Sequence, residues 1–411
     1  MELILKSPKI KGVLTAPDSK SDLHRKLILS SLFGGKIRYN SPLSDDILAT
    51  VNALKALGSD ITDDGETLTL TKVTFGGNAE IDCKESGSTL RFCLPLAAFL
   101  NKTATFKACS SLAERPIKPM IDALSACGIS FSRDTLPFEI SGKLTKTDFS
   151  VDPSLSSQFV SGILMSLALT GGTLTLKNPP VSAPYINMTL SSLDLFGVKY
   201  KFENNVYTVE KSAEKIDKII SPEGDYSSAS PLLLLASLGG EVTVKNLFKS
   251  SLQADRAVVD ILKTYSRVSV SEDSVTVISE KTIKNIPLDI SCKDTPDLIP
   301  LLAVFACAIK GVSVFKDASR LELKESRRAT NTVSLINSLG GKAVFDGEKI
   351  TVFGSGKLKG GKVPSFGDHR LVFAAAVASA ISEREIVIEN AECINKSYPN
   401  FITDLKNLGG I

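Results

Sequence analysis

The sequence predicts an α/β protein assembled from six β-α-β-α-β-β repeats. Six helix ends share one pattern, they recur at nearly constant spacing, and five of the six are followed by strand-like hairpins. The six segments are LKALG, LSACG, LDLFG, LKTYS, INSLG and LKNLG, which end at Gly58, Gly128, Gly197, Ser266, Gly340 and Gly409. Consecutive ends lie 69 to 74 residues apart, so six repeats account for nearly all of the 411 residues.

The elements of one repeat follow from local patterns. Five of the six helix ends carry glycine, which best tolerates a left-handed helix cap. Two short alternating runs then surround a turn, as in KAVFDGEKITVFG, where Asp346-Gly347 is a typical hairpin turn. A second helix, as in DTPDLIPLLAVFACAI, is apolar nearly all round and must be buried. A ring of six repeats and two lobes of three repeats both satisfy this pattern.

Composition and charge exclude several classes of protein. The chain has 48 Lys+Arg against 45 Asp+Glu and only 6% aromatic residues, which argues against a dedicated nucleic-acid binder. The most apolar stretches, Leu298–Ile309 and Leu371–Ile381, are well short of the roughly 20 residues that span a bilayer. The beginning, MELILKSPKIKG, is too charged for the apolar region of a signal peptide. We therefore expect a cytoplasmic protein without nucleic-acid or membrane partners.

Cysteine and histidine offer little material for a metal site. The seven cysteines form no CxxC pair, and only His24 and His369 could join them as ligands. Most of the cysteines stand in apolar runs, where the thiol behaves as a small buried hydrophobe. We expect free thiols in a reducing compartment and no bound metal.

The starts of the six apolar helices are rich in Ser, Asp, Gly and Thr and lie near cations. They read DSKSDLHR, ESGSTLR, SLSSQF, GDYSSAS, DTPDL and GDHRL. The cations at or near them are Lys20, Arg25, Arg91, Arg115, Lys324, Arg328, Arg370 and Lys396. Helix starts attract anions through unpaired N–H groups and the helix dipole. Plain capping explains any single start, and a solvated charge any single cation, but their recurrence predicts a site for a small anion with two or three charges.

The chain resembles the family of 5-enolpyruvylshikimate-3-phosphate (EPSP) synthases. The matching motifs, in order, are PDSKSDLHR (17–25), SDDI (44–47), ESGSTLRF (85–92), ERPI (114–117), SSQF (156–159), SAPYI (182–186), EGDYSSAS (223–230), DTPDL (294–298), KESRR (324–328), GDHR (367–370) and NKSYP (395–399). The resemblance implies two lobes of three repeats each, with the active site in the cleft between them. One lobe would comprise residues 1–18 and 224–411, and the other residues 19–223.

The resemblance also implies a reaction and its binding residues. The family transfers the enolpyruvyl group of phosphoenolpyruvate to the 5-hydroxyl of shikimate 3-phosphate and releases phosphate. The shikimate 3-phosphate residues would be Lys20, Ser21, Arg25, Ser156, Ser157, Gln158, Ser182, Tyr185, Asp297 and Lys324. The phosphoenolpyruvate residues would be Lys20, Gly87, Arg115, Gln158, Arg328, Arg370 and Lys396.

The same resemblance assigns the proton transfers. Asp297 would accept the hydroxyl proton, and Glu325 with Lys20 would protonate C3 of phosphoenolpyruvate. No metal or organic cofactor is implied, and the family is usually monomeric. Each assignment has a simpler alternative: Asp297 as a helix cap, Glu325 as a surface pair with Arg328, and His369 with Arg370 as a helix-start pair without a role.

Several positions depart from the family pattern. The family often has N-A-G-T-A-M-R-P where this chain has Glu85, Ser86, Gly87, Ser88, Thr89, Leu90, Arg91 and Phe92. His24 replaces an Asn before Arg25, and Arg327 replaces a common acidic residue. None of these changes removes a predicted catalytic group.

Two other functions are compatible with the repeat pattern. The sister enzyme that transfers enolpyruvate to UDP-N-acetylglucosamine typically uses a loop cysteine before an Arg-Pro pair, and Cys109 stands six residues before Arg115-Pro116. That enzyme, however, has K-N-A where this chain has Lys20-Ser21-Asp22. A non-catalytic or RNA-end-processing repeat protein would need a basic surface, which the near-neutral charge disfavours.

Overall fold

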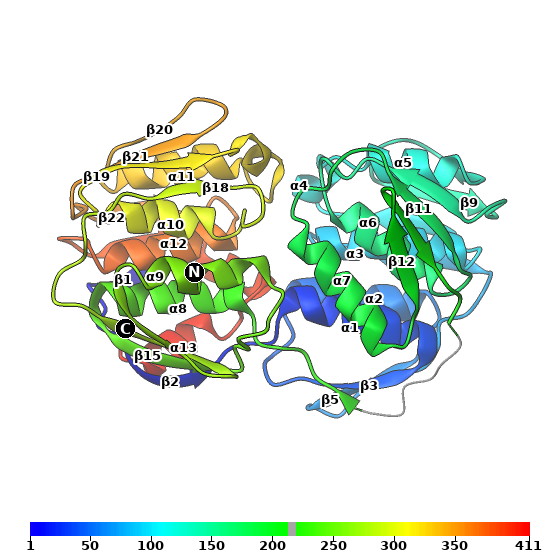
Figure 1. Ribbon diagram of the computed structural model, residues 1–411, viewed down its shortest axis with the longest axis horizontal. Coiled ribbons are helices and arrows are strands. Elements are labelled where there is room, and N and C mark those ends of the chain that lie inside the picture. The colour runs from blue at the N-terminus through cyan, green and yellow to red at the C-terminus, as the bar shows by residue number, and fades with distance from the viewer. Residues whose placement is uncertain (213–218) are drawn as a thin grey trace. The chain divides into compact units, whose positions relative to one another are not determined.

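The computed structural model describes residues 1–212 and 219–411, and the chain forms two compact units (Figure 1). One, which we call the discontinuous unit, consists of Met1–Ser19 and Glu223–Ile411. The other, the continuous unit, is Lys20–Pro222. The chain passes between the units twice, between Ser19 and Lys20 and between Pro222 and Glu223.

The continuous unit contains seven described helices and twelve described strands. Its helices are α1 Lys20–Phe33, α2 Asp45–Ala56, α3 Gly87–Phe99, α4 Ser110–Ala113, α5 Lys118–Ser125, α6 Gln158–Leu167 and α7 Pro184–Leu195. Its strands are β3 Gly35–Arg38, β4 Ile61–Asp63, β5 Thr67–Leu70, β6 Asn78–Asp82, β7 Thr103–Lys107, β8 Ile129–Phe131, β9 Phe138–Gly142, β10 Asp148–Val151, β11 Gly172–Leu176, β12 Tyr200–Glu203, β13 Val206–Val209 and β14 Ile219–Ile220.

The discontinuous unit is also built of helices and short strands, and it includes both ends of the chain. Its helices are α8 Tyr226–Gly239, α9 Ala257–Leu262, α10 Ile299–Ala306, α11 Arg328–Ser338, α12 His369–Ser379 and α13 Phe401–Asn407, with short 3-10 helices η1 Ala254–Arg256, η2 Ser319–Leu323 and η3 Ala391–Lys396. Its strands are β1 Leu3–Leu5, β2 Lys11–Thr15, β15 Glu241–Lys245, β16 Ser266–Val270, β17 Ser274–Ser279, β18 Asp289–Ser291, β19 Gly311–Lys316, β20 Ala343–Phe345, β21 Ile350–Gly354, β22 Gly361–Pro364 and β23 Ile386–Glu389.

Each repeat folds as one small sheet. In the sheet β6-β7-β9-β8, the strands β6 and β7 are parallel and joined through α3, whereas β8 and β9 form an antiparallel hairpin. Five sheets have four strands, and each combines one parallel pair with one antiparallel hairpin. The sixth has three strands, β1-β23-β22, because β1 from the beginning of the chain pairs antiparallel with β23 where the other repeats have their hairpin.

Distant segments complete the first repeat of each unit. Strand β2 lies parallel to β15, and β14 lies parallel to β3. The two segments that lead between the units pair with each other, because Asp18 forms a β-bridge with Gly224 and the Ser19 N–H donates to the Glu223 carbonyl oxygen over 2.7 Å. These backbone contacts hold together the two segments through which the chain passes from one unit to the other.

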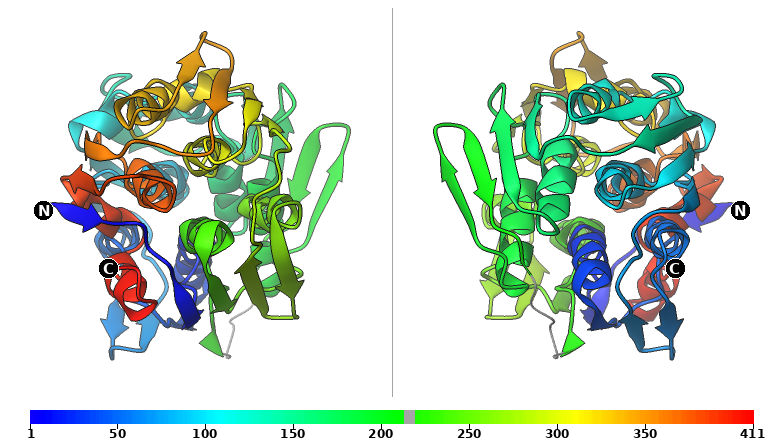
Figure 2. Two further views of the ribbon diagram at one scale, coloured as in Figure 1. Left: turned by 90° about the vertical axis from the view of Figure 1, so that its left-hand side faces the viewer. Right: turned by 90° about the vertical axis from the view of Figure 1, so that its right-hand side faces the viewer.

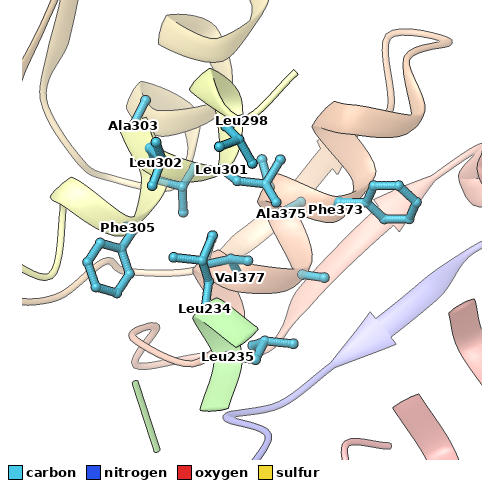
Figure 3. Packing of buried hydrophobic residues seen from close by; sticks show 14 of the residues in the cluster. Leu234, Leu235, Leu298, Leu301, Leu302, Ala303, Phe305, Phe373, Ala375 and Val377 are labelled. Carbon is cyan, nitrogen blue, oxygen red and sulfur yellow. The ribbon is translucent and has the colours of Figure 1, made fainter. Parts of the chain in front are cut away.

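The second helix of each repeat forms the core, which confirms the prediction that it is buried. In the discontinuous unit every residue of α10 and α12 is buried, and α8 packs against both. Leu234 of α8, Leu301 of α10 and Val377 of α12 belong to one apolar cluster (Figure 3). The left view of Figure 2 looks roughly along these three helices. Within the described ranges, no helix is long and apolar enough to cross a membrane.

The continuous unit is organised in the same way around α1, α3 and α6. Helices α3 and α6 approach most closely at Gly162, where an added Cβ would lie 2.2 Å from the carbonyl oxygen of Arg91 and 3.1 Å from Pro95 Cγ. Only glycine permits this contact between helix backbones. The close approach fixes the start of α3 relative to α6.

We expect Gly162→Ala to lower the free energy of unfolding by at least about 1–3 kcal/mol, the usual cost of overpacking a core. Urea denaturation would measure it. Gly239→Ala is the matched control, because that glycine also lies in a helix and an added Cβ would meet nothing within 4 Å. Equal stability of the two variants would contradict the close packing of α3 against α6.

Candidate active site

In the continuous unit, Arg25 ties the start of α1 to other predicted binding segments. Its buried guanidinium donates from Nε to Thr189 Oγ1 over 2.8 Å. Nη1 donates to the Ser21 carbonyl oxygen over 2.6 Å, and Nη2 donates to the Tyr185 carbonyl oxygen over 2.8 Å. Burial lowers the pKa of Arg25 to about 10, so the group stays charged at neutral pH. Arg25 therefore positions Ser21 and Tyr185 as well as supplying charge.

Lys20 is the first residue of α1 and forms a largely buried ion pair. Its Nζ lies 2.7 Å from Oδ2 of Asp46, which stands in the first turn of α2. The exposed fractions of the two side chains are 17% and 8%. Asp46 therefore holds the ammonium group of Lys20 in place.

Gly87 begins α3 between two guanidinium groups. A Cβ at this position would lie 2.6 Å from Nη1 of Arg91 and 3.2 Å from Nη1 of Arg115. Ser86 caps the helix, since its Oγ accepts a hydrogen bond from the Thr89 N–H at 3.2 Å. The helix start thus presents backbone N–H groups beside two cations, an arrangement suited to an anion.

Gln158, the first residue of α6, joins this group. Its Oε1 accepts a hydrogen bond from Arg91 Nη1 at 3.0 Å, and its Nε2 donates to Ser88 Oγ at 2.9 Å. Ser156 Oγ accepts from the Gln158 N–H at 3.2 Å. The buried Ser157 takes the N-cap position of α6, but its side chain does not cap the helix.

Ser182 and Tyr185 stand at the start of α7. Ser182 is buried and has a left-handed backbone, with a φ of 52°. Tyr185 lies in the first turn, where its carbonyl oxygen binds Arg25. The residues predicted to bind shikimate 3-phosphate from this unit therefore stand at helix starts that Arg25 and Gln158 connect.

In the discontinuous unit, Arg328 is the centre of a buried charge cluster. Its Nε lies 2.9 Å from Asp368 Oδ2, its Nη1 lies 2.7 Å from Asp297 Oδ1, and its Nη2 lies 2.5 Å from Glu325 Oε2. Burial alone would lower the pKa of Arg328, but these carboxylates raise it well above the usual value. The alternative of a surface pair between Glu325 and Arg328 is wrong, because Arg328 is only 1% exposed.

Asp297 contacts two arginines and does not cap a helix. Leu298 holds the N-cap position of α10 without a side-chain cap, which overturns the capping alternative. Asp297 Oδ2 instead accepts a hydrogen bond from Arg370 Nη2 at 3.2 Å. Burial would raise the pKa of Asp297, but the charges of Arg370, Arg328 and Lys324 outweigh it and hold that pKa well below its usual range.

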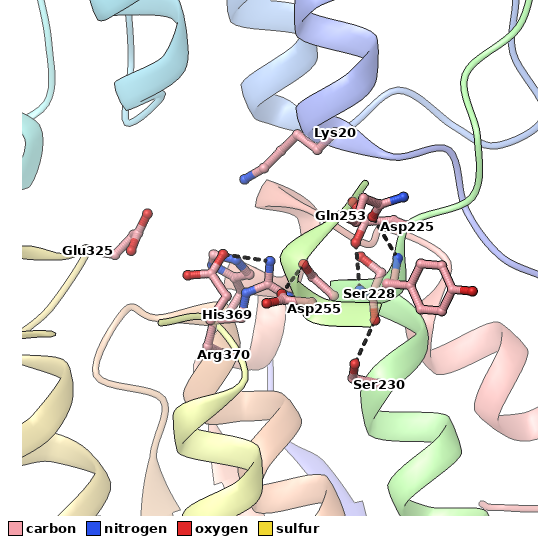
Figure 4. A network of polar contacts seen from close by, with 12 residues as sticks. Lys20, Asp225, Ser228, Ser230, Gln253, Asp255, Glu325, His369 and Arg370 are labelled. Atoms are coloured by element: carbon pink, nitrogen blue, oxygen red, sulfur yellow. Dashed lines mark hydrogen bonds and ion pairs between the residues drawn. The ribbon is translucent and has the colours of Figure 1, made fainter. Parts of the chain in front are cut away.

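Side chains hold the start of α8 in the same unit (Figure 4). Asp225 Oδ1 accepts from the Ser228 N–H at 2.7 Å and caps the helix. Gln253 Oε1 accepts from the Tyr226 N–H at 2.9 Å, and its Nε2 donates to the Gly224 carbonyl oxygen at 2.7 Å. Asp368 caps α12 in the same manner, which the serine- and aspartate-rich helix starts predicted for both helices.

Asp255 is a buried carboxyl close to these residues, drawn beside Arg370 in Figure 4. Its Oδ2 accepts a hydrogen bond from Ser227 Oγ, while Oδ1 has no hydrogen-bond partner among the described residues. Burial and the negative charge of Asp297 raise the pKa of Asp255 to about 7, although the charge of Arg370 opposes them. Asp255 therefore titrates near neutral pH.

The remaining predicted residues of this unit are Lys324, Lys396 and His369 of the helix-start pair. Lys324 directly precedes Glu325, and Lys396 is the buried last residue of η3. His369 begins α12 and is buried. Arg327, the departure from the acidic family residue, is exposed and pairs with Glu322 at 2.9 Å, so it leaves the cluster unchanged.

The sequence analysis assigns no role to several residues that hold the predicted binding residues of the two units in place. Asp46 and Asp368 lie inside the motifs SDDI and GDHR, which offered a signal. The sequence analysis names Arg91 among the cations near the helix starts but assigns it to neither substrate. Asp255 and Gln253 lie in SLQADR, which carries no distinguishing pattern. Their contacts depend on long-range folding, which no local motif reveals.

The titration of Asp255 predicts how stability varies with pH. Its pKa in the folded protein is about 7, above the ordinary aspartate value of 3.8, so the folded state binds more protons than the unfolded state between these values. The contribution of Asp255 therefore destabilises the protein progressively as pH rises from about 4 to 7. Urea midpoints measured across this range should show Asp255→Asn gaining stability relative to the parent protein as pH rises. A difference that does not vary with pH would contradict the raised pKa.

Comparison with known proteins identifies the family. The model of the EPSP synthase (3-phosphoshikimate 1-carboxyvinyltransferase) family matches residues 4–405. A 3-phosphoshikimate 1-carboxyvinyltransferase of Methanocorpusculum labreanum is 35% identical, covering 100% of this chain and 99% of the relative. One from Clostridium kluyveri is also 35% identical, covering 98% and 96%. The EPSP synthase of Acinetobacter baumannii has the same fold, with a TM-score of 0.78 at 20% identity over 100% of this chain and 98% of that one. The chain belongs to the EPSP synthase family.

Proposed function

We propose that this protein transfers the enolpyruvyl group of phosphoenolpyruvate to the 5-hydroxyl of shikimate 3-phosphate. The observation that carries the proposal is the full-length family match, together with charged residues at the family's motif positions in both units. Both substrates carry a phosphate and a carboxylate. The cations of the two units therefore suit the charge of the substrates. Neither unit alone carries all of the residues that are predicted to bind the two substrates.

Residues of both units are proposed to bind the substrates. Gly87, Arg115 and Gln158 would hold phosphoenolpyruvate from the continuous unit, and the buried contacts around Gly87 support this. Arg328, Arg370 and Lys396 would bind it from the discontinuous unit. The shikimate 3-phosphate residues are Lys20, Ser21, Arg25, Ser156, Ser157, Gln158, Ser182, Tyr185, Asp297 and Lys324.

Asp297 is proposed to accept the proton of the attacking hydroxyl. As this proton leaves, the hydroxyl oxygen bonds to C2 of phosphoenolpyruvate while C3 gains a proton, which gives a tetrahedral intermediate. Arg328 and Arg370 hold the pKa of Asp297 low, so Asp297 is ionised before the reaction. A substrate carboxylate on the same arginines would share their charge and raise the proton affinity of Asp297.

Glu325 and Lys20 are proposed to supply the proton to C3. The carboxyl group of Glu325 is held by Arg328, and the ammonium of Lys20 is held by Asp46, so each group has a fixed position in its unit. In the second step C3 returns a proton to the group that supplied one in the first step, the bond from C2 to the phosphate oxygen breaks, and phosphate leaves. These residues supply acid–base chemistry directly, so the proposal includes no metal or organic cofactor.

The proposal extends to the setting of the enzyme. All seven cysteines are free, five of them buried, which suits a reducing compartment such as the cytoplasm. A single chain carries every residue assigned above, which supports action as a monomer. Small anionic molecules are its proposed partners.

Phosphate release from phosphoenolpyruvate with shikimate 3-phosphate as acceptor tests the reaction. We expect release in the parent protein and a kcat lowered by about 10²–10⁴-fold in Asp297→Asn, the usual contribution of a positioned acid or base. Asp294→Asn is the matched control, because Asp294 belongs to the same motif but is exposed. Equal activity of Asp297→Asn and Asp294→Asn would refute Asp297 as the base.

The same assay with UDP-N-acetylglucosamine tests the sister reaction. Cys109 is an exposed thiol just before α4, and the proposed mechanism does not use it. We expect no phosphate release with the nucleotide sugar and full activity of Cys109→Ser with shikimate 3-phosphate. Release with the nucleotide sugar alone, lost in Cys109→Ser, would replace the proposed function with the sister reaction.

A further inference from the structure

A chain of buried hydrogen bonds connects three helices of the continuous unit. His24 Nδ1 lies 2.8 Å from Thr50 Oγ1, and Thr50 Oγ1 lies 2.7 Å from Thr89 Oγ1. Thr89 Oγ1 donates to Ser86 Oγ at 2.7 Å. The chain thus runs from α1 through α2 to the N-cap of α3, and all four residues are buried.

The directions of these hydrogen bonds fix the protonation of His24. The single hydroxyl proton of Thr89 is given to Ser86 Oγ, or to the Asp46 carbonyl oxygen at 3.4 Å, so Thr89 can only accept from Thr50. Thr50 has then given its own proton and must accept from Nδ1 of His24. His24 therefore carries its proton on Nδ1, and Nε2 is left as an acceptor.

The surroundings of His24 keep the imidazole neutral. Burial first, and then the charges of Lys20 and Arg25, lower the pKa of His24 well below its usual value. The Nε2 atom is buried and has no hydrogen-bond partner in the described ranges, so a proton there would find no acceptor. The edge of Phe92 covers the ring, with the two ring centroids 6.3 Å apart.

The chain ends where phosphoenolpyruvate is proposed to bind. Ser86 immediately precedes Gly87, where an added Cβ would lie 2.6 Å from Nη1 of Arg91 and 3.2 Å from Nη1 of Arg115. A displacement of a few tenths of an ångström at this helix start would change the spacing between the backbone N–H groups and the two guanidinium groups. The position of Ser86 therefore controls the geometry of the anion site.

Three departures from the family pattern meet in this one chain. The pattern has Ala at the positions of Ser86 and Thr89, and Asn at the position of His24. Alanine could not continue the chain, because it has no hydroxyl group. The hydroxyl groups of Ser86 and Thr89 are therefore what carries the chain to the start of α3.

We propose that His24 is a positioning residue, which as a neutral Nδ1-protonated imidazole anchors the chain through Thr50 and Thr89 to Ser86 and thereby sets the affinity for phosphoenolpyruvate. The inference rests on the proposed function for the identity of the ligand. The hydrogen-bonded chain itself can be tested without the reaction.

The first experiment is ¹⁵N NMR of histidine-labelled protein. The chain has only two histidines, so His24→Asn assigns the signals. We expect His24 to show a protonated Nδ1 and an unprotonated Nε2, unchanged from pH 8 to about 5.5, because the pKa lies well below the ordinary value. A proton on Nε2, or titration of His24 within this range, would overturn the proposal.

The second experiment measures steady-state kinetics of Thr50→Val, which removes the hydroxyl and keeps the shape. We expect KM for phosphoenolpyruvate to rise about fivefold, the effect of losing one neutral hydrogen bond. Both kcat and KM for shikimate 3-phosphate should stay within about twofold. Thr50→Ser should restore the parent value, because it restores the hydroxyl.

Two further variants complete the design. Thr89→Ala breaks the chain at the next link and should have the same effect, which keeps the test decisive if Thr50→Val does not fold. Ser31→Ala is the control, because Ser31 is a buried hydroxyl of α1 that bonds only within its own helix, to the Ile28 carbonyl oxygen. An unchanged KM in both chain variants, or an equal loss in Ser31→Ala, would overturn the proposal.

The two proposals fail in different ways. If the parent protein releases no phosphate with shikimate 3-phosphate, the proposed function fails, and the histidine spectrum still decides whether the hydrogen-bonded chain exists. If the reaction proceeds but the chain variants bind phosphoenolpyruvate normally, only the positioning role of His24 is refuted.

Discussion

The burial of one helix in each repeat is the constraint on which the rest of the structure depends. Helices α10 and α12 are buried along their whole length, and the polar residues of α12 stand at its two ends. The first N–H groups of a helix lack partners within it and must be met by caps or ligands. Asp225, Asp368 and Ser86 meet part of this need. The burial that stabilises each unit therefore also concentrates its anion-binding capacity at the helix starts.

The two units use their arginines differently. Arg25 donates hydrogen bonds to groups within the continuous unit, so its main effect is to connect segments of that unit. Arg328 is likewise enclosed by three carboxylates, and removing any one of them would leave buried charge poorly compensated. Arg370 donates from Nη2 to Asp297, while its buried Nε and Nη1 have no hydrogen-bond partner among the described residues. Arg370 thus keeps two guanidinium nitrogens that make no hydrogen bond within the described part of the chain.

Local patterns predicted the repeats and the helix starts, because both depend on neighbours in sequence. The hairpin at Asp346-Gly347 and the caps at Asp225 and Asp368 are examples, since each involves residues a few positions apart. Pairings between distant segments gave no such signal. The strand β1 closes the last sheet across more than 380 residues of chain, and Asp255 reaches the cluster only through the packing of η1 beside α8. The same limit applies to Asp297, whose sequence position fits a helix cap, whereas in the structure its carboxylate contacts two arginines.

Four departures from the family pattern are connected by hydrogen bonds or ring contacts near the start of α3: His24, Ser86, Thr89 and Phe92. Phe92 replaces proline, and its ring packs edge-to-face against His24 while the Arg25 guanidinium carbon lies 5.4 Å from the ring centroid. A neutral imidazole suits this place, because a further cation between Lys20 and Arg25 would be repelled by both. Thr50 links the imidazole to the hydroxyl groups of Thr89 and Ser86, so the buried Nδ1 has a partner, whereas Nε2 has none among the described residues. A buried polar group is costly unless its hydrogen bonds are made, so loss of one hydroxyl would leave its neighbour in this series of hydrogen bonds without a partner.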